Sequence, residues 1–245
     1  MAIYQNYYYI ITAIIGIVSV IFTSCSAGIG NSLVVESEEK NYNDLKKFSF
    51  IIIWISCICT TCLLSLFQPF MKWWVGEELL LPISCVILLC IYYYIYEINY
   101  LLNAYKDSAG IWHKDRFRPL ITAMSNLVLN LILVNIIGLY GVILSTVLTM
   151  LIIGMPWLVH NLFTEVFKRR AKEYVFNLLK YTVTVVICVV VSYFVCSFIS
   201  GYNILLLMLR GVICLVISNI IWILSYRKSD EMAGTINIVK RILKR

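Results

Sequence analysis

The sequence predicts an all-α integral membrane protein, a bundle of about seven transmembrane helices. The 245-residue chain is 61% hydrophobic and 13% charged, with a mean hydropathy of +0.88, whereas soluble domains are ~45–50% apolar and ~25% charged. Its apolar runs repeatedly reach the ~20 residues that a helix needs to cross a bilayer. They far exceed the ~10-residue alternating segments of a membrane barrel. The backbone N–H and C=O groups must therefore form their hydrogen bonds within helices.

The seven spans are expected at about residues 7–28, 48–66, 83–104, 120–137, 142–159, 178–199 and 204–226. No soluble domain fits between them. The first span has no basic segment before it and no cleavage site followed by a polar chain, so we expect no removable signal peptide. Residues 227–245 are expected to form a basic amphipathic tail.

The distribution of basic residues predicts the orientation, because Lys and Arg near span ends favour the cytoplasmic side. Eighteen of the 20 Lys and Arg lie on one side, in connections or, for Lys180, at the inner end of the sixth span, while Lys72 lies on the other side and Arg210 lies within the seventh span. We therefore expect a multi-pass protein of the cytoplasmic (inner) membrane, with its N-terminus outside and its C-terminus in the cytoplasm.

Two segments on the predicted inner side have the pattern of helices that lie on a membrane. After the fifth span, apolar Phe163, Val166, Phe167 and Tyr174 alternate with the basic residues of 168–172. After the seventh span, Ser229 and Asp230 could cap a second helix. Its apolar face is Met232, Ile236, Val239 and Leu243, flanked by Lys240, Arg241, Lys244 and Arg245. Binding to anionic lipid is the expected role of both, with docking of a protein partner as the alternative.

The nine cysteines all fall in apolar runs, where they act as small hydrophobic residues. Cys59 and Cys62 have the C-x-x-C spacing of redox and zinc sites. They lie in the middle of a predicted span, and the chain has only two His. We therefore expect neither a metal site nor a cofactor.

The sequence also lacks the motifs of the common enzyme classes, such as a phosphate-binding loop, a nucleophile elbow or H-E-x-x-H. The longest predicted outer connection, residues 67–82, has only Lys72, Glu77 and Glu78 as charged residues. We therefore expect no catalytic residues and no enzymatic activity.

Polar residues within the predicted spans are the remaining candidates, because they are costly in a bilayer. Glu97 is the only acidic residue within a span, about 21 Å below the outer edge at the helical rise per residue. It could bind a proton or Na⁺, or it could bind sugar hydroxyls in a cavity lined by Tyr93, Tyr94 and Tyr100. Alternatively its carboxylate reaches the inner interface or a neighbouring Lys.

Three further candidates lie in the fourth and seventh spans. Arg210 lies about 9 Å below the outer end of its span. It could attract a phosphate or an acidic sugar, or extend to the outer headgroups. In the fourth span Asn126 and Asn130 continue a stripe from Thr122, which could form an interhelical hydrogen-bonded seam or line a hydrophilic lumen.

The most polar stretch of the chain, residues 105–119, is predicted to be a turn on the inner face. Its Lys114, Arg116 and Arg118 follow from the positive-inside rule. The alternative is that they recruit a phosphorylated lipid headgroup from the inner leaflet.

Several segments together resemble the polysaccharide biosynthesis flippases, the O-antigen and capsule repeat-unit transporters of the MATE-like superfamily. The resemblance covers nearly the whole chain and is most specific over residues 6–142. It rests on Asn6-Tyr7-Tyr8-Tyr9-Ile10-Ile11, Ser26-Ala27-Gly28-Ile29-Gly30-Asn31, Glu36-Ser37, Pro69-Phe70, Trp74-Val75-Gly76-Glu77, Lys106-Asp107 through Gly110, Asp115-Arg116, Pro119, Asn126-Leu127 and Gly138-Leu139-Tyr140-Gly141-Val142.

This resemblance implies a two-lobed transporter of twelve to fourteen spans, in which this chain corresponds to spans eight to fourteen, the C-terminal lobe. The first lobe would be absent. The implied activity is translocation of undecaprenyl-diphosphate-linked oligosaccharide repeat units for O-antigen or capsule. Basic groups would hold the diphosphate, and Asn and Tyr would bind sugar hydroxyls.

The implied partners are the lipid-linked oligosaccharide, membrane lipids and other polysaccharide-assembly proteins, with no nucleic acid. One alternative is a MATE-like cation-coupled drug exporter that uses Glu97 as its coupling carboxylate. A membrane enzyme of glycan assembly is the second alternative, and an assembly partner or remnant without transport activity is the third.

Overall fold

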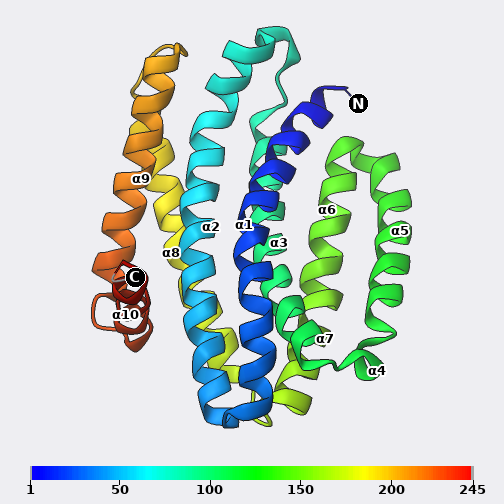
Figure 1. Ribbon diagram of the computed structural model, residues 1–245. Coiled ribbons are helices and arrows are strands. Elements are labelled where there is room, and N and C mark those ends of the chain that lie inside the picture. Colours follow the sequence, from blue (N-terminus) through cyan, green and yellow to red (C-terminus); the bar gives the residue numbers. More distant parts are fainter. Residues whose placement is uncertain (1, 244–245) are drawn as a thin grey trace. The chain divides into compact units, whose positions relative to one another are not determined.

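The computed structural model describes residues 2–243, with side chains described for 3–237 and 240, and every secondary-structure element in this part of the chain is a helix (Figure 1). The all-α prediction is therefore confirmed. Seven of its helices are long and apolar enough to cross a membrane, as a multi-pass membrane protein requires. They cover Ile3–Val35, Glu38–Val75, Ile83–Ala109, Trp112–Ile137, Leu139–Val166, Lys172–Ser197 and Ile204–Tyr226.

Several helices are longer than the apolar runs that predicted them. Helix α1 spans Ala2–Val35, α2 spans Glu38–Val75 and α3 spans Ile83–Ala109. Their polar ends are suited to the headgroup region, where hydropathy no longer marks a helix. Pro69 lies within α2, near its C-terminal end.

The other helices are α4 (Trp112–Asp115), α5 (Arg118–Ile137), α6 (Leu139–Thr149), α7 (Met155–Asn161), α8 (Lys172–Ser197), α9 (Ile204–Tyr226) and α10 (Asp230–Leu243). A π-helical turn, Met150–Gly154, joins α6 to α7, and another, Leu162–Val166, follows α7. Residues Leu139 to Val166 therefore form one continuous helix that contains two π-helical turns.

The chain divides into two compact units. Unit 1 contains residues 1–4, 43–83 and 174–245, and unit 2 contains residues 5–42 and 84–173. Unit 1 is thus built from most of α2 with α8, α9 and α10. Unit 2 is built from α1, the start of α2, and α3 to α7.

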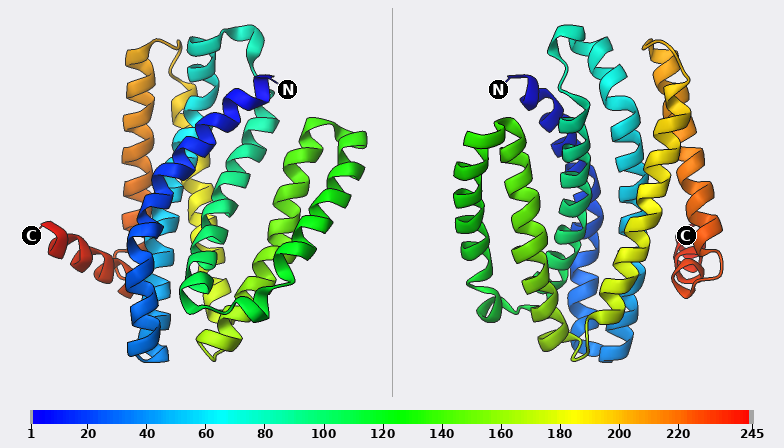
Figure 2. Two further views of the ribbon diagram at one scale, coloured as in Figure 1. Left: turned by 45° about the vertical axis from the view of Figure 1, so that its right-hand side comes forward. Right: turned by 180° about the vertical axis from the view of Figure 1, so that it is seen from behind.

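An aromatic cluster forms part of the core of unit 1, where α2, α8 and α9 lie side by side (Figure 2). Trp222 on α9 is fully buried. The centroid of its ring lies 5.3 Å from the ring centroid of Phe50 and 6.0 Å from that of Tyr181. The ring centroid of Tyr226 lies 4.9 Å from that of Trp222, and the Tyr226 hydroxyl shares a 2.7 Å hydrogen bond with the Thr184 hydroxyl on α8. These contacts bring together helices that are far apart in the sequence.

A second aromatic cluster in unit 2 corrects the prediction for the segment after the fifth span. Phe163 and Phe167 are buried, and their rings lie 5.9 and 6.1 Å from the ring of Tyr42. The ring centroids of Tyr105 and Phe167 lie 6.2 Å apart. In unit 1, buried Tyr174 shares a 2.9 Å hydrogen bond with Ser49. These side chains pack inside the protein, so the predicted membrane-surface helix is wrong here.

Ion pairs hold the basic end of the same segment against the start of α2. Lys168 Nζ lies 2.6 Å from Glu38 Oε1, and Arg169 pairs with Glu39. The hydrogen bond to Glu38 raises the pKa of the Lys168 ammonium. Two of the basic residues that predicted lipid binding, Lys168 and Arg169, therefore form ion pairs within unit 2.

The tail is helical as expected, and Ser229 caps it by accepting a 3.2 Å hydrogen bond from the Met232 amide. Met232 is buried and Ile236 is exposed. The side chains of Val239, Arg241 and Leu243, and residues Lys244 and Arg245, lie outside the described residues.

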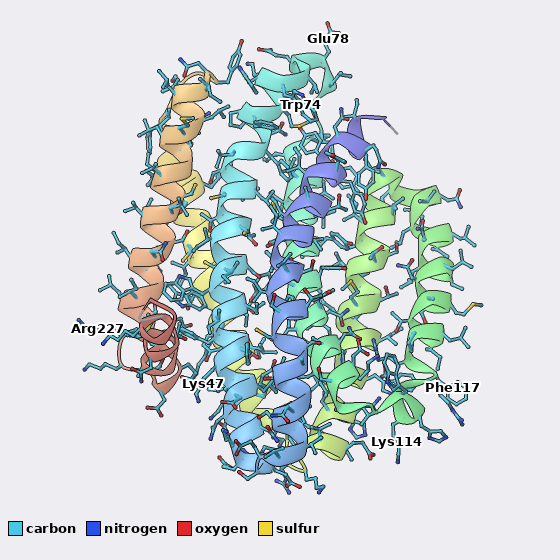
Figure 3. The ribbon with its side chains drawn as sticks, viewed as in Figure 1. Lys47, Trp74, Glu78, Lys114, Phe117 and Arg227 are labelled. Atoms are coloured by element: carbon cyan, nitrogen blue, oxygen red, sulfur yellow. The ribbon has the colours of Figure 1, made fainter. Side chains whose placement is uncertain are left out.

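Figure 3 labels two basic residues and two others at opposite ends of unit 1. Lys47 and Arg227 lie toward one end of its helices, and Trp74 and Glu78 lie at the other. This separation has the form that the positive-inside rule requires. The assignment of the Lys47 end to the cytoplasm stays a prediction.

Helices α5 and α6 form an antiparallel hairpin in unit 2 (Figures 1 and 2). Gly138 makes the turn with a φ of 56°, a conformation that favours glycine. Gly141 lies directly against α5, since a Cβ added there would be 2.4 Å from the Leu133 carbonyl carbon and 2.6 Å from the Val134 nitrogen. The helix backbones are in contact at this point, as at small-residue interfaces in membranes.

We predict that Gly141→Ala destabilises the protein by about 1–3 kcal/mol, because the added methyl group meets backbone atoms that cannot rotate away. Gly16→Ala on α1 is the matched control, since nothing lies within 4 Å of its added Cβ. It should change the free energy of unfolding by no more than about 1 kcal/mol. SDS-induced unfolding in mixed micelles measures both, and equal effects would contradict the close approach of α5 and α6.

Candidate functional site

A polar pocket of about 400 Å³ opens between α1 and α3 in unit 2. One wall is apolar and aromatic, with the rings of Phe22 and Tyr100 4.7 Å apart. A 3.3 Å hydrogen bond from Ser108 Oγ to the Ser26 carbonyl ties the helices together beside it. The lining residues are Phe22, Thr23 and Ser26 from α1 and Tyr100, Asn103, Ala104, Asp107 and Ser108 from α3.

The lining combines hydroxyl, amide and carboxylate groups with an aromatic face. Asp107 is the one acidic lining residue, and its carboxylate lies 2.6 Å from Lys106 Nζ. This ion pair offsets its charge, so the pocket is close to neutral. A pocket of this size with a few polar groups suits a small, hydroxyl-rich ligand.

Sequence reasoning found only part of this pocket: it expected Tyr93, Tyr94 and Tyr100 to line a cavity, and of these three only Tyr100 lines this one. Thr23 and Ser26 are ordinary weakly polar residues in an apolar span, and nothing in the sequence pairs α1 with α3. Tyr100 was one available signal, and Asn103, about one and a half turns beyond Glu97, was another.

The turn between α3 and α5 is held by a buried ion pair. Asp115 is 2% exposed and Arg118 is 7% exposed. The Arg118 guanidinium donates two hydrogen bonds of 2.7 Å to Asp115, from Nε to Oδ1 and from Nη2 to Oδ2. This bidentate geometry is the strongest that an Arg and a carboxylate can adopt.

The same pair connects the turn to the pocket and to α7. Arg118 Nη2 also donates a 2.8 Å hydrogen bond to Oδ1 of the pocket residue Asn103. Asn161 on α7 donates a 3.1 Å hydrogen bond to Asp115, and Lys106 Nζ lies 3.7 Å from it. Residues from four helices therefore meet at one carboxylate and one guanidinium.

Arg116 and Arg118, which the sequence placed in one basic cluster, have different surroundings. Arg118 is buried and bonded within unit 2, so its guanidinium already has an anionic partner. Arg116 is exposed, bonds His113 Nε2 at 3.2 Å and lies 4.6 Å from the Phe117 ring centroid. Lys114 and Phe117 mark this turn in Figure 3.

Glu97 lies within α3 and is 1% exposed. Its Oε1 has no hydrogen-bond partner, and the ion pairs among the described residues do not include it. The neighbouring Lys that would explain it structurally is therefore not found in the described part of the chain. Glu97 does not line the pocket, although helical spacing puts it on the same face as Tyr100 and Ala104.

Asn126 joins α5 to α6. Its side-chain nitrogen donates to Thr146 and Thr149, both at 3.3 Å. Asn130, one turn further along α5, is half-buried. Asn126 thus takes part in an interhelical seam, the use that membrane helices commonly make of such residues.

Arg210 on α9 belongs to unit 1 and is 7% exposed. Its Nη2 donates a 2.6 Å hydrogen bond to the Ile199 carbonyl, just beyond the end of α8. The side chain is buried against the α8–α9 connection and borders a cavity there. The pocket residues described above belong to unit 2.

The nine cysteines are free thiols. The Sγ atoms of Cys196 and Cys214 lie 3.8 Å apart in the core of unit 1. Among the described residues, no group of three or more His, Cys, Asp or Glu could hold a metal ion.

Comparisons with protein-family models, curated proteins and solved structures found no match. The structure itself is all-helical in its described part, with seven helices long and apolar enough to cross a membrane and a polar pocket in unit 2.

We predict that Asp115→Asn lowers the free energy of unfolding by about 3–5 kcal/mol, because it leaves the buried Arg118 without a counter-charge. Glu165→Gln is the matched control, since it breaks a 3.3 Å pair with Lys114, whose side chain is largely exposed. That variant should cost less than about 1 kcal/mol. SDS titration in mixed micelles measures both, and a loss below 1 kcal/mol for Asp115→Asn would refute the central role of the pair.

Proposed function

We propose that this protein takes part in moving a lipid-linked oligosaccharide across the cytoplasmic membrane, as a flippase or as the C-terminal part of one. The observation that carries the proposal is the neutral pocket between α1 and α3. The sequence resemblance to the O-antigen and capsule flippases supports the same class of substrate.

The chemistry of the pocket suits a sugar. Hydroxyl, amide and carboxylate side chains can exchange hydrogen bonds with sugar hydroxyls in both directions. The aromatic pair Phe22 and Tyr100 offers a flat apolar surface for the C–H face of a sugar ring. An undecaprenyl tail would remain in the lipid, and only the sugar would need a polar pocket.

The ion pair at the turn gives this pocket a connection to the proposed cytoplasmic side. Arg118 binds both Asp115 and Asn103. A rearrangement of the turn would therefore move a side chain of the pocket. Alternating access requires such coupling between a binding site and one face of the membrane.

The first test measures binding of undecaprenyl-diphosphate-linked oligosaccharide to the purified chain. We predict that Tyr100→Leu weakens binding about thirtyfold, since it removes an aromatic contact and a hydroxyl worth about 2 kcal/mol together. Tyr9→Leu is the control, because Tyr9 is 67% exposed on α1 and outside the pocket. Native mass spectrometry gives both affinities.

Undecaprenyl diphosphate without sugar should bind equally to wild type and Tyr100→Leu. If the sugar makes no difference to the effect of Tyr100→Leu, the pocket is not the sugar site. Expression in a flippase-deficient strain tests transport, where restored surface polysaccharide supports the proposal. Failure to restore it favours an assembly partner, and sugar transfer by the purified chain would favour an enzyme.

The buried carboxyl of Glu97 favours one second candidate, a cation-coupled exporter, because such a group can bind a proton or a cation. If the protein acts as proposed on the sugar lipid through the α1–α3 pocket, Glu97→Gln should change translocation by less than about twofold. A vesicle flux assay with a fluorescent sugar lipid measures this. Cation-driven dye efflux that falls more than tenfold in Glu97→Gln would identify the exporter instead.

A further inference from the structure

A cavity of about 370 Å³ in unit 1 lies where the end of α2 meets the connection between α8 and α9. Gln68, Pro69 and Lys72 come from α2, while Leu80 and Leu81 follow the short helix Glu77–Leu79. Gly201 and Tyr202 precede α9, and Arg210 comes from its second turn. Two basic side chains and several apolar ones therefore face one space.

Arg210 brings an uncompensated charge to this cavity. It is buried, one of its terminal nitrogens bonds the Ile199 carbonyl, and the other, Nη1, has no hydrogen-bond partner among the described residues. No carboxylate of the described chain forms an ion pair with it. Together with Gln68 and Pro69 it also borders a second cavity of about 150 Å³. A buried guanidinium without an anion is costly, so this arrangement favours binding of one.

Lys72 supplies a second positive charge. Its ammonium lies 4.7 Å from the ring centroid of Tyr202, which also lines the cavity. Lys72 forms an ion pair with Glu77, whose side chain is 65% exposed and does not line the cavity. One of the two positive charges is thus offset, and one remains for a ligand.

We propose that this cavity is a binding site for a phosphate group, with Arg210 and Lys72 as its ligands. The planar guanidinium matches two phosphate oxygens, and the ammonium adds a point charge. The apolar residues Pro69, Leu80 and Leu81 beside them suit the glycerol and acyl portion of a phospholipid. Because the site lies wholly in unit 1 and needs no sugar, it stands independently of the function proposed above.

The test measures binding of radiolabelled phosphatidic acid and inorganic phosphate to the immobilised full chain by scintillation proximity. Arg210→Gln should weaken binding at least about tenfold, as expected for a charge-assisted bidentate contact. Lys72→Gln should weaken it about threefold. Glu77→Gln should strengthen it about twofold, since it frees the Lys72 ammonium. Arg227→Gln is the control just beyond the C-terminal end of α9 and should have no effect, because Arg227 is exposed and outside the cavity.

Arg210 also holds the Ile199 carbonyl, so its substitution could disturb folding. The opposite effects of Lys72→Gln and Glu77→Gln then decide the question, because the side chains of Lys72 and Glu77 are 31% and 65% exposed and tolerate substitution better than a buried one. Saturable binding of both probes with this pattern supports a site for phosphate itself, and binding of phosphatidic acid alone supports a lipid headgroup site. Absence of saturable binding, no opposite shift in the two variants, or an equal loss in Arg227→Gln would overturn the proposal.

Discussion

The ion pair between Asp115 and Arg118 is the interaction on which unit 2 most depends. Two buried charges are stable only when each has the other and further hydrogen bonds, and here Asn103 and Asn161 provide those bonds. The pair lies where α3, α4, α5 and α7 come together. It fixes a polar turn that hydrophobic packing alone would leave free, and through Asn103 it orients one wall of the pocket.

The α5–α6 hairpin is stabilised by close packing at a small residue rather than by an ion pair. Lipid is as apolar as a leucine side chain, so two membrane helices gain little from hiding hydrophobic surface and must gain from close contact and hydrogen bonds. Gly141 allows the backbones to touch, and Asn126 crosses the same interface to Thr146 and Thr149. The opposite face of α5 exposes large apolar residues such as Leu131 and Met124, as a lipid-facing helix does.

The seven helices could be predicted because a bilayer demands long apolar runs, and their length is visible in composition alone. Which helices pack against one another could not be predicted, because hydropathy carries no information on helix–helix contacts. Phe163 and Phe167 have the pattern of a membrane-surface helix, yet Tyr42 from a distant segment covers them. The α1 side of the pocket could not be predicted for the same reason, since Ser26 becomes a candidate only beside α3. Arg118 seemed equivalent to Arg116 until Asp115 was placed against it.

Arg118 and Arg210 show how a charge in a membrane protein can be structural or functional at equal burial. Both side chains are 7% exposed, so exposure does not separate them. Arg118 has a carboxylate in bidentate contact, and its charge is neutralised within the fold. Arg210 has one carbonyl, which can accept a hydrogen bond but cannot balance a charge. A fold that retains such a group without a counter-charge stores binding energy for an external anion, and the cavity beside Arg210 is where that anion would enter.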